Sequence, residues 1–132
     1  MRLVLVRHAE AAPGAPDAER PLTSRGREQA RELGERLARE GIRPETVLTS
    51  PLRRARETAD LVGTALGVGP EPDARLAPGA TAERVREAIA GRGELVLAVG
   101  HQPDCGRIAA AIRGGPEPPF PTAGVLVLDV AV

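Results

Sequence analysis

Several residue types that define common folding and binding strategies are scarce or missing in this sequence. Among its 132 residues there is no Trp, no Tyr and no Lys, and only one Phe and one Cys. The lone Cys105 cannot form an internal disulfide, and one cysteine with two histidines cannot build a four-ligand protein zinc site. We therefore expect no metal and no cofactor, with a three-ligand catalytic metal site as the less favoured alternative.

Charge excess and long apolar runs are also missing. The 18 basic residues, all of them Arg, balance 18 acidic ones, so no global basic field attracts nucleic acid, and the single aromatic leaves no platform for stacking bases. No apolar run approaches the roughly 20 residues needed to span a bilayer, and no charged-then-apolar leader opens the chain. We expect a cytoplasmic protein without membrane or nucleic-acid partners, in which any anion site uses guanidinium or imidazole groups.

Strand-like and helix-like patterns alternate along the chain. Apolar runs predict strands at 3–6, 45–49, 94–99 and 125–130, and apolar stripes at spacings of three and four predict helices at about 24–40, 51–66, 82–90 and 103–112. Segments 9–21, 67–79 and 116–121 have the Gly and Pro content of loops. This alternation predicts one α/β domain over residues 1–132, a three-layer α/β/α sandwich with a mainly parallel sheet.

The expected helix starts depend on polar and proline residues. Thr23 or Ser24 suits the N-cap of the first helix, and Thr81 suits that of the third. Ser50 is predicted to cap the second helix with Pro51 at its first position, and Pro103 is predicted to start the fourth. Gly41 is placed where a helix-terminating glycine is expected.

The only two histidines each follow a predicted buried strand. Arg7 and His8 end the first strand, and His101 follows the strand at 94–99. In open α/β sheets ligands bind beyond the carboxyl ends of the strands, so both histidines are expected at one edge of the sheet. For either histidine alone, a hydrogen-bonded structural role is the more common alternative.

Three arginines crowd the first turns of the second helix. Arg53, Arg54 and Arg56 oppose the positive end of the helix dipole, and a bound anion would relieve this repulsion; the alternative is a solvated face paired with acids. Arg7 and Arg54 offer two guanidinium forks that fit phosphoryl oxygens, with helix N-termini near Ser50 and Gln102 as expected backbone donors. A histidine that is neutral near pH 7 could then attack phosphorus.

Other catalytic patterns are not supported. Cys105 is interpreted as a small buried hydrophobe, because a cysteine-dependent phosphatase loop would need arginine at position 111, which is Ala. Ser50 lies outside a Gly-x-Ser-x-Gly elbow, and no Gly-x-x-x-x-Gly-Lys loop is present.

Five motifs in order resemble the histidine phosphatase superfamily, whose fold is phosphoglycerate mutase-like, and within it the small phosphohistidine phosphatases of the SixA type. The motifs are Val6-Arg7-His8-Ala9-Glu10-Ala11, Pro21 to Ala30 (PLTSRGREQA), Ser50 to Thr58 (SPLRRARET), Val99-Gly100-His101-Gln102-Pro103 and Phe120-Pro121-Thr122-Ala123. The resemblance implies that His8 is a nucleophile that becomes phosphorylated. It also implies that Arg7, Arg54 and His101 bind the phosphoryl group.

Two departures from the family pattern bear on the substrate. Ala9 replaces the glycine of the Arg-His-Gly motif, a variant associated with the small branch. Pro78 stands where many members carry a glutamate that serves as general acid, with Glu10, Asp17 and Glu19 as unsupported substitutes. An alkoxide leaving group needs such an acid, whereas imidazole can leave already protonated.

The preferred hypothesis is therefore a signal-transducing hydrolase that removes phosphate from phosphohistidine on a protein, for example a histidine-containing phosphotransfer domain. The alternatives are a phosphatase of small phosphate esters and, less favoured, a non-catalytic phosphate-binding module.

Overall fold

The computed structural model describes residues 1–131 and contains one five-stranded sheet. Its strands are β1 (Arg2–Arg7), β2 (Thr46–Thr49), β3 (Pro70–Pro72), β4 (Leu95–Gly100) and β5 (Val125–Asp129). Their order across the sheet is β3-β2-β4-β1-β5, and every neighbouring pair is parallel except β1 and β5. The chain thus places β4 between β1 and β2, although β4 is the fourth strand in the sequence.

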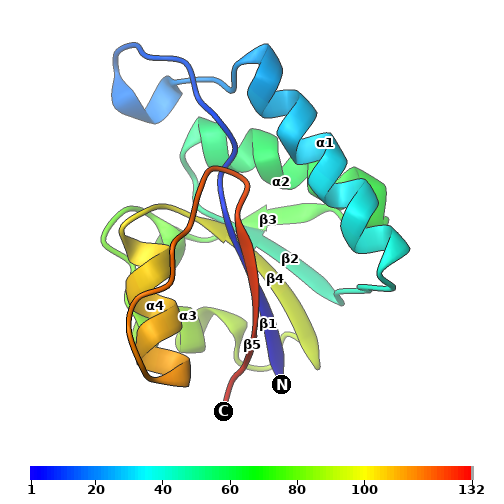
Figure 1. The fold of residues 1–132 in the computed structure, drawn as a ribbon, viewed down its shortest axis with the longest axis vertical. Helices are drawn as coiled ribbons and strands as arrows, with labels where there is room; N and C mark the ends of the chain where they lie inside the picture. Colours follow the sequence, from blue (N-terminus) through cyan, green and yellow to red (C-terminus); the bar gives the residue numbers. More distant parts are fainter. Residues whose placement is uncertain (132) are drawn as a thin grey trace.

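Four helices cover the two faces of this sheet. They are α1 (Ser24–Arg39), α2 (Arg53–Leu66), α3 (Ala82–Ile89) and α4 (Asp104–Arg113), with short 3-10 turns at Asp17–Glu19 and Ala74–Leu76. Figure 1 shows α1 and α2 on one face of the sheet and α3 and α4 on the other. The predicted three-layer α/β sandwich is confirmed. Within residues 1–131, no helix combines the length and the apolar character needed to cross a membrane.

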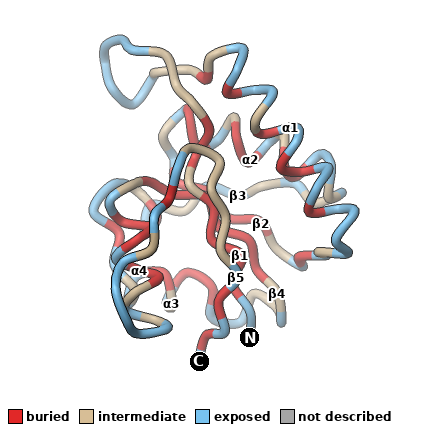
Figure 2. Tube along the Cα trace, viewed as in Figure 1, coloured by how far each residue is buried: buried red, intermediate tan, exposed pale blue. Residues whose placement is uncertain are grey.

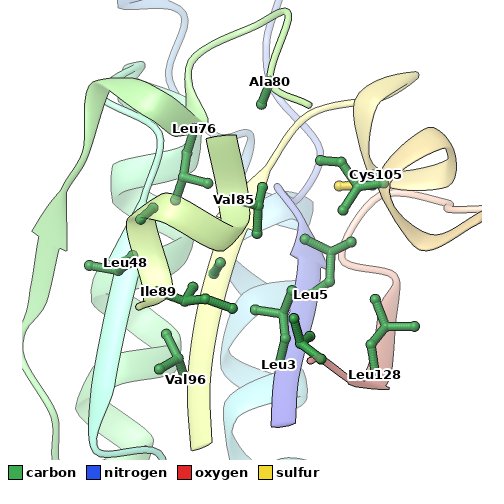
Figure 3. Close-up of a cluster of buried hydrophobic side chains, with 14 of the residues drawn as sticks. Leu3, Leu5, Leu48, Leu76, Ala80, Val85, Ile89, Val96, Cys105 and Leu128 are labelled. Carbon is green, nitrogen blue, oxygen red and sulfur yellow. The ribbon is translucent and has the colours of Figure 1, made fainter. Parts of the chain in front are cut away.

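The apolar core lies on both faces of the sheet because successive strand residues point to opposite sides. Leu3 and Leu5 of β1 pack with α3 and α4, while Val4 and Val6 pack with α1 and α2. Figure 2 shows the buried residues concentrated in the strands and the inward helix faces, and Figure 3 shows the cluster around Leu3 and Leu5. An almost continuous aliphatic run in β1 is what a strand buried on both faces requires.

Two of the predicted caps are confirmed. The Thr23 hydroxyl accepts a hydrogen bond from the Gly26 amide (2.9 Å), and the Thr81 hydroxyl accepts one from the Arg84 amide (3.2 Å). Each bond satisfies a first-turn amide that has no partner within its own helix. Gly41 follows α1 with φ = 78°, the left-handed conformation expected of a helix-terminating glycine.

The predicted start of the second helix is wrong. Ser50 continues the pattern of β2, because its amide donates to the carbonyl of Val99 in β4 (2.9 Å), and α2 begins only at Arg53 with Leu52 as an N-cap that makes no side-chain bond. Pro51 lies in the turn between them. The Ser50 hydroxyl accepts from the Leu52 amide (3.3 Å) and also contacts Nε2 of His101 across the sheet (2.7 Å), three residues before the first residue of α2.

Two further expectations are corrected. Pro103 is the N-cap of α4 instead of its first residue, and the Gly106 amide in the first turn donates to the side-chain oxygen Oε1 of Gln102 (2.8 Å). The segment 67–79, predicted as loop throughout, contains β3 at the edge of the sheet beside β2. Prolines at both ends of β3 conceal it in the sequence, since proline marks edge strands and loops alike.

Candidate active site

The carboxyl ends of three neighbouring strands bring Ser50, His101 and His8 into one row. Arg7 pairs with Gly100 in the β1–β4 register, and Thr49 pairs with Val99 in the β2–β4 register. The residues that follow these positions therefore stand side by side, and the ring centroids of the two histidines are 5.3 Å apart. The sheet topology thus brings together the two histidines that the sequence predicted at one edge.

The ring of His8 is oriented by its own chain. Its Nδ1 lies 2.7 Å from the carbonyl oxygen of Ala9, and because a carbonyl only accepts, Nδ1 carries the proton. The lone pair of the neutral ring is then on Nε2. Ala9 is fixed in turn, because its amide donates to the Thr58 hydroxyl (3.0 Å) and that hydroxyl donates to the carbonyl of Arg54 (2.8 Å). The orientation of the His8 ring and helix α2 are therefore coupled.

Arg7 and Arg54 are held by backbone and side-chain acceptors. Nη1 of Arg7 donates to the carbonyl of Phe120 (2.9 Å). Arg54 is only 7% exposed, and its Nη1 and Nη2 donate to the carbonyl oxygen and to Oδ2 of Asp17 (2.9 and 3.2 Å). Arg54 reaches over to the segment that follows His8. This segment was predicted as a loop, and its residue Asp17 contacts Arg54 through these two bonds.

The other two arginines of α2 take the alternative role. Nε of Arg53 pairs with Glu57 (3.2 Å), and Nε of Arg56 donates to the carbonyl of Pro51 (2.8 Å). Both are exposed. Of the three arginines in the first turns of α2, Arg54 is therefore buried, whereas Arg53 and Arg56 form a solvated helix face.

Two buried nitrogen atoms of this cluster lack partners. Among residues 1–131, the buried side-chain nitrogens without a hydrogen-bond partner are Arg7 Nε, His101 Nδ1 and Arg92 Nε. The last lies before β4, at the opposite end of the sheet, while the first two belong to the residues around His8. A buried donor left unpaired costs about 1–3 kcal/mol. An anionic ligand would give the Arg7 guanidinium and the His101 ring the partners that these two nitrogens lack.

The comparisons with known proteins agree with this geometry. The family model of the histidine phosphatase superfamily (branch 1) matches residues 3–81. The phosphohistidine phosphatase SixA of Escherichia coli (strain K12) is 30% identical over 133 residues, covering 96% of this chain and 83% of the relative. The chain belongs to the histidine phosphatase superfamily.

Two further relatives extend this result. An uncharacterised protein of Picosynechococcus is 41% identical over 124 residues, which cover 87% of this chain and 74% of the relative. The solved structure of the protein histidine phosphatase SixA complexed with tungstate has a TM-score of 0.88 at 30% identity, covering 96% of this chain and 86% of that one. The resemblance predicted from five motifs is thus confirmed, and with it the histidine phosphatase fold and a general phosphatase character.

Burial and positive charge keep both histidines of this histidine phosphatase neutral. Burial lowers the pKa of His8 to about 4, an effect that the Ala9 carbonyl opposes and that Arg54 and Arg7 strengthen. Burial lowers the pKa of His101 to about 3, with His8 and Arg54 adding to the shift and Asp17 opposing it. Near pH 7 both imidazoles therefore carry a lone pair, which a nucleophile requires.

These depressed pKa values predict a specific loss of stability in acid. Below pH 6.5 the histidines of the unfolded chain take up protons while those of the folded chain do not, so stability falls from about pH 6.5 towards pH 4, by up to about 1.4 kcal/mol per pH unit for each histidine. Imidazole NMR titration of the free protein should show two neutral rings at pH 5.5, and inorganic phosphate should raise both pKa values. Two rings protonated at that pH in the free protein would contradict the burial argument.

Backbone donors at the helix starts stay a prediction, and bonds within the protein already occupy some of these amides. The second helix starts at Arg53, three residues beyond Ser50, and near Gln102 the amides of Cys105 and Gly106 are already bonded within the protein.

Cys105 follows its predicted structural role, because burial and Asp104 raise the pKa of its thiol to about 12. The thiol therefore stays protonated and packs in the core.

The candidate acids on the segment after β1 are poorly suited to donate a proton. The Glu10 carboxylate accepts from the Thr23 hydroxyl (2.9 Å) at the start of α1, and Glu19 is exposed. Hydrogen bonds from Arg20, and then from Arg54, lower the pKa of Asp17 below its ordinary value. Pro78, which the resemblance predicted to replace a glutamate, is exposed and has no acidic group.

Sequence reasoning missed three groups that hold the site together. Ser50 was predicted as a cap, yet its hydroxyl lies 2.7 Å from Nε2 of His101. Thr58 was not singled out, although it repeats the position of Arg54 one helical turn later and is fully buried. The role of the Phe120 backbone carbonyl cannot be read from the sequence, because every residue has a backbone carbonyl. The rule that placed the histidines at strand ends also applies to Ser50, and it could have found that residue.

Proposed function

We propose that this protein removes the phosphoryl group from phosphohistidine carried by another protein. The observation that supports it most is the pair of buried, unpartnered nitrogens, Arg7 Nε and His101 Nδ1, beside the oriented ring of His8. With the Arg54 guanidinium they supply donors for a phosphoryl group next to a nitrogen lone pair. Preorganised donors of this kind stabilise the charge of a phosphoryl-transfer transition state.

The reaction consists of two displacements at phosphorus. In the first, Nε2 of His8 forms a bond to phosphorus as the bond from phosphorus to the substrate nitrogen breaks, and the imidazole leaves. In the second, water attacks phosphorus, the bond to Nε2 breaks, and its electron pair returns to His8; the water proton leaves with orthophosphate or solvent. The covalent intermediate divides one difficult step into two easier ones.

The choice of a phosphoramidate substrate follows from the acids. A phosphate monoester releases an alkoxide, and the general acid that protonates it contributes typically about 10²–10⁴-fold. Asp17 is the acidic residue that contacts Arg54, and two arginines hold it ionised. Imidazole needs no such donor, because its second nitrogen can be protonated before the bond breaks. The name of the E. coli relative, a phosphohistidine phosphatase, supports the same substrate class.

Turnover of different substrates tests this proposal. The purified protein is assayed on a phosphorylated histidine-containing phosphotransfer domain and on a panel of sugar and aryl phosphates. We expect kcat/KM to be highest for the phosphoprotein, by about 10²-fold or more, the contribution of the absent acid. A preference for sugar phosphates would instead support the alternative function, a phosphatase of small esters.

Asp17→Asn serves as the internal control of the same assay. This variant keeps the shape of the side chain but cannot act as an acid. We expect phosphohistidine turnover to be retained, with inorganic phosphate bound at least as tightly because no carboxylate competes for Arg54. Selective loss of ester turnover in this variant would identify Asp17 as an acid and weaken the phosphoramidate argument.

A further inference from the structure

The hydroxyl of Ser50 lies between two partners at the end of β2. It is 2.7 Å from Nε2 of His101, and it accepts a hydrogen bond from the Leu52 amide (3.3 Å). Ser50 is fully buried, and His101 is 4% exposed. Water therefore has little access to this contact, so the neighbouring protein groups determine whether the Ser50 hydroxyl or Nε2 of His101 donates the proton.

The Leu52 contact decides which atom donates between Ser50 and His101. A hydroxyl has one proton and two lone pairs, and the Leu52 amide already uses one lone pair. If Nε2 of His101 carried the proton, both neighbours would donate to Ser50 and the hydroxyl proton would lack an acceptor, a cost of about 1–3 kcal/mol in a buried position. If Nε2 is unprotonated, the hydroxyl donates to it and both groups are satisfied.

The protonation of Nδ1, the second nitrogen of the His101 ring, follows from that of Nε2. A neutral imidazole has one proton, so an acceptor at Nε2 requires a donor at Nδ1. Nδ1 of His101 is one of the three buried side-chain nitrogens without a partner among residues 1–131, and the His101 ring lies next to the ring of His8 (centroids 5.3 Å apart). A proton there can be donated to an oxyanion, whereas a lone pair there would repel one.

We propose that Ser50 is a positioning residue that holds His101 in the neutral tautomer protonated on Nδ1, so that this N–H is presented to the phosphoryl oxygens. Its effect on catalysis rests on the proposed function; its effect on the tautomer does not. His101 then contributes a donor without carrying a full charge. The two histidines thus have the same tautomer and different roles, because a carbonyl sets the ring of His8 and a hydroxyl sets the ring of His101.

The test measures the tautomer directly in the free protein. Imidazole nitrogens that carry a proton differ clearly in ¹⁵N chemical shift from those that do not, and the sequence holds only two histidines. A His8→Gln sample assigns the His101 signals, because it leaves one imidazole. In the unsubstituted protein at pH 7, we expect the His101 proton on Nδ1. In Ser50→Ala we expect the population to shift towards the Nε2-protonated form.

Function is measured on the same variants. Ser50→Ala should lower kcat/KM by about 10–100-fold, approaching the loss seen when one transition-state donor is removed, and should weaken the binding of inorganic phosphate. Ser50→Thr keeps the hydroxyl and should restore both the tautomer and most of the activity. Thr46→Val is the matched control, because it removes a hydroxyl from the other end of β2, where Thr46 bonds only to the carbonyl of Arg92 (2.7 Å).

Each outcome has one meaning. An unchanged His101 tautomer in Ser50→Ala overturns the inference, and so does a shifted tautomer with full activity. Ser50→Thr, checked for folding by urea unfolding, guards against a general effect of the substitution. If the unsubstituted protein hydrolyses neither phosphohistidine nor phosphate esters, the proposed function fails, while the tautomer result stands independently.

Discussion

His8→Ala should abolish turnover and leave no covalent phosphoenzyme. The substitution removes the nitrogen that the proposed mechanism bonds to phosphorus, and loss of a nucleophile lowers kcat by on the order of 10⁴-fold or more. The expected effect is large because Nε2 of His8 is the lone pair that the Ala9 carbonyl orients towards the site. The measurement is rapid-quench trapping of acid-labile, alkali-stable phosphate on the protein during turnover.

His101→Gln is the variant that separates the two histidines. It removes a group that is proposed to bind the phosphoryl oxygens but keeps the nucleophile, so labelling of His8 should continue at a reduced rate.

A phosphoenzyme that forms normally in His8→Ala would mean that another residue is the nucleophile. Cys105 is poorly suited to this role, because its thiol is fully buried in the apolar core, where burial raises its pKa to about 12.

The central strands and the two histidines could be predicted because their signals are local. Continuous aliphatic runs such as 3–6 and 95–99 indicate strands buried on both faces, and the carboxyl edge of a parallel sheet is where ligands bind. Residues that end such strands are therefore candidates before any contact is known. The observed register, in which Arg7 pairs with Gly100, completes that expectation.

The contacts that hold the site together could not be predicted, because they depend on strand order. A serine followed by proline fits a helix start equally well, and only the placement of β2 beside β4 shows that Ser50 meets His101 instead. The same applies to Asp17, whose bond to Arg54 joins segments 37 residues apart. Local preference and tertiary contact compete at these positions, and the tertiary contact prevails.

Among the three arginines of α2, helix geometry explains which one faces the site. Residues four apart lie on one face of a helix, and Arg54 shares its face with the buried Thr58. Arg53 and Arg56 are rotated away from that face towards solvent. Of the three arginines, Arg54, the one predicted to bind phosphate, is the buried one, and the other two form the solvated face that was the alternative for the cluster.

Arg54→Lys should lower kcat/KM by on the order of 10²–10³-fold although it preserves the charge. Arg54 uses two separate nitrogens, Nη1 and Nη2, for two acceptors on Asp17, and the same fork fits two phosphoryl oxygens. A lysine ammonium is a single point donor on a flexible stem, so it cannot make two parallel bonds in fixed geometry. The loss in folding stability should be only about 1–2 kcal/mol, because one hydrogen bond is removed.

Arg53→Lys is the matched control for this substitution. Arg53 precedes Arg54 on the same helix, is exposed, and makes a single ion pair with Glu57 that lysine can also form. Its activity should therefore stay within about twofold of the unsubstituted protein, as exposed ion pairs contribute little. Urea unfolding of both variants separates effects on stability from effects on turnover. Near-normal activity in Arg54→Lys, or equal losses in the two variants, would show that the Arg54 fork does not bind the transferred phosphoryl group.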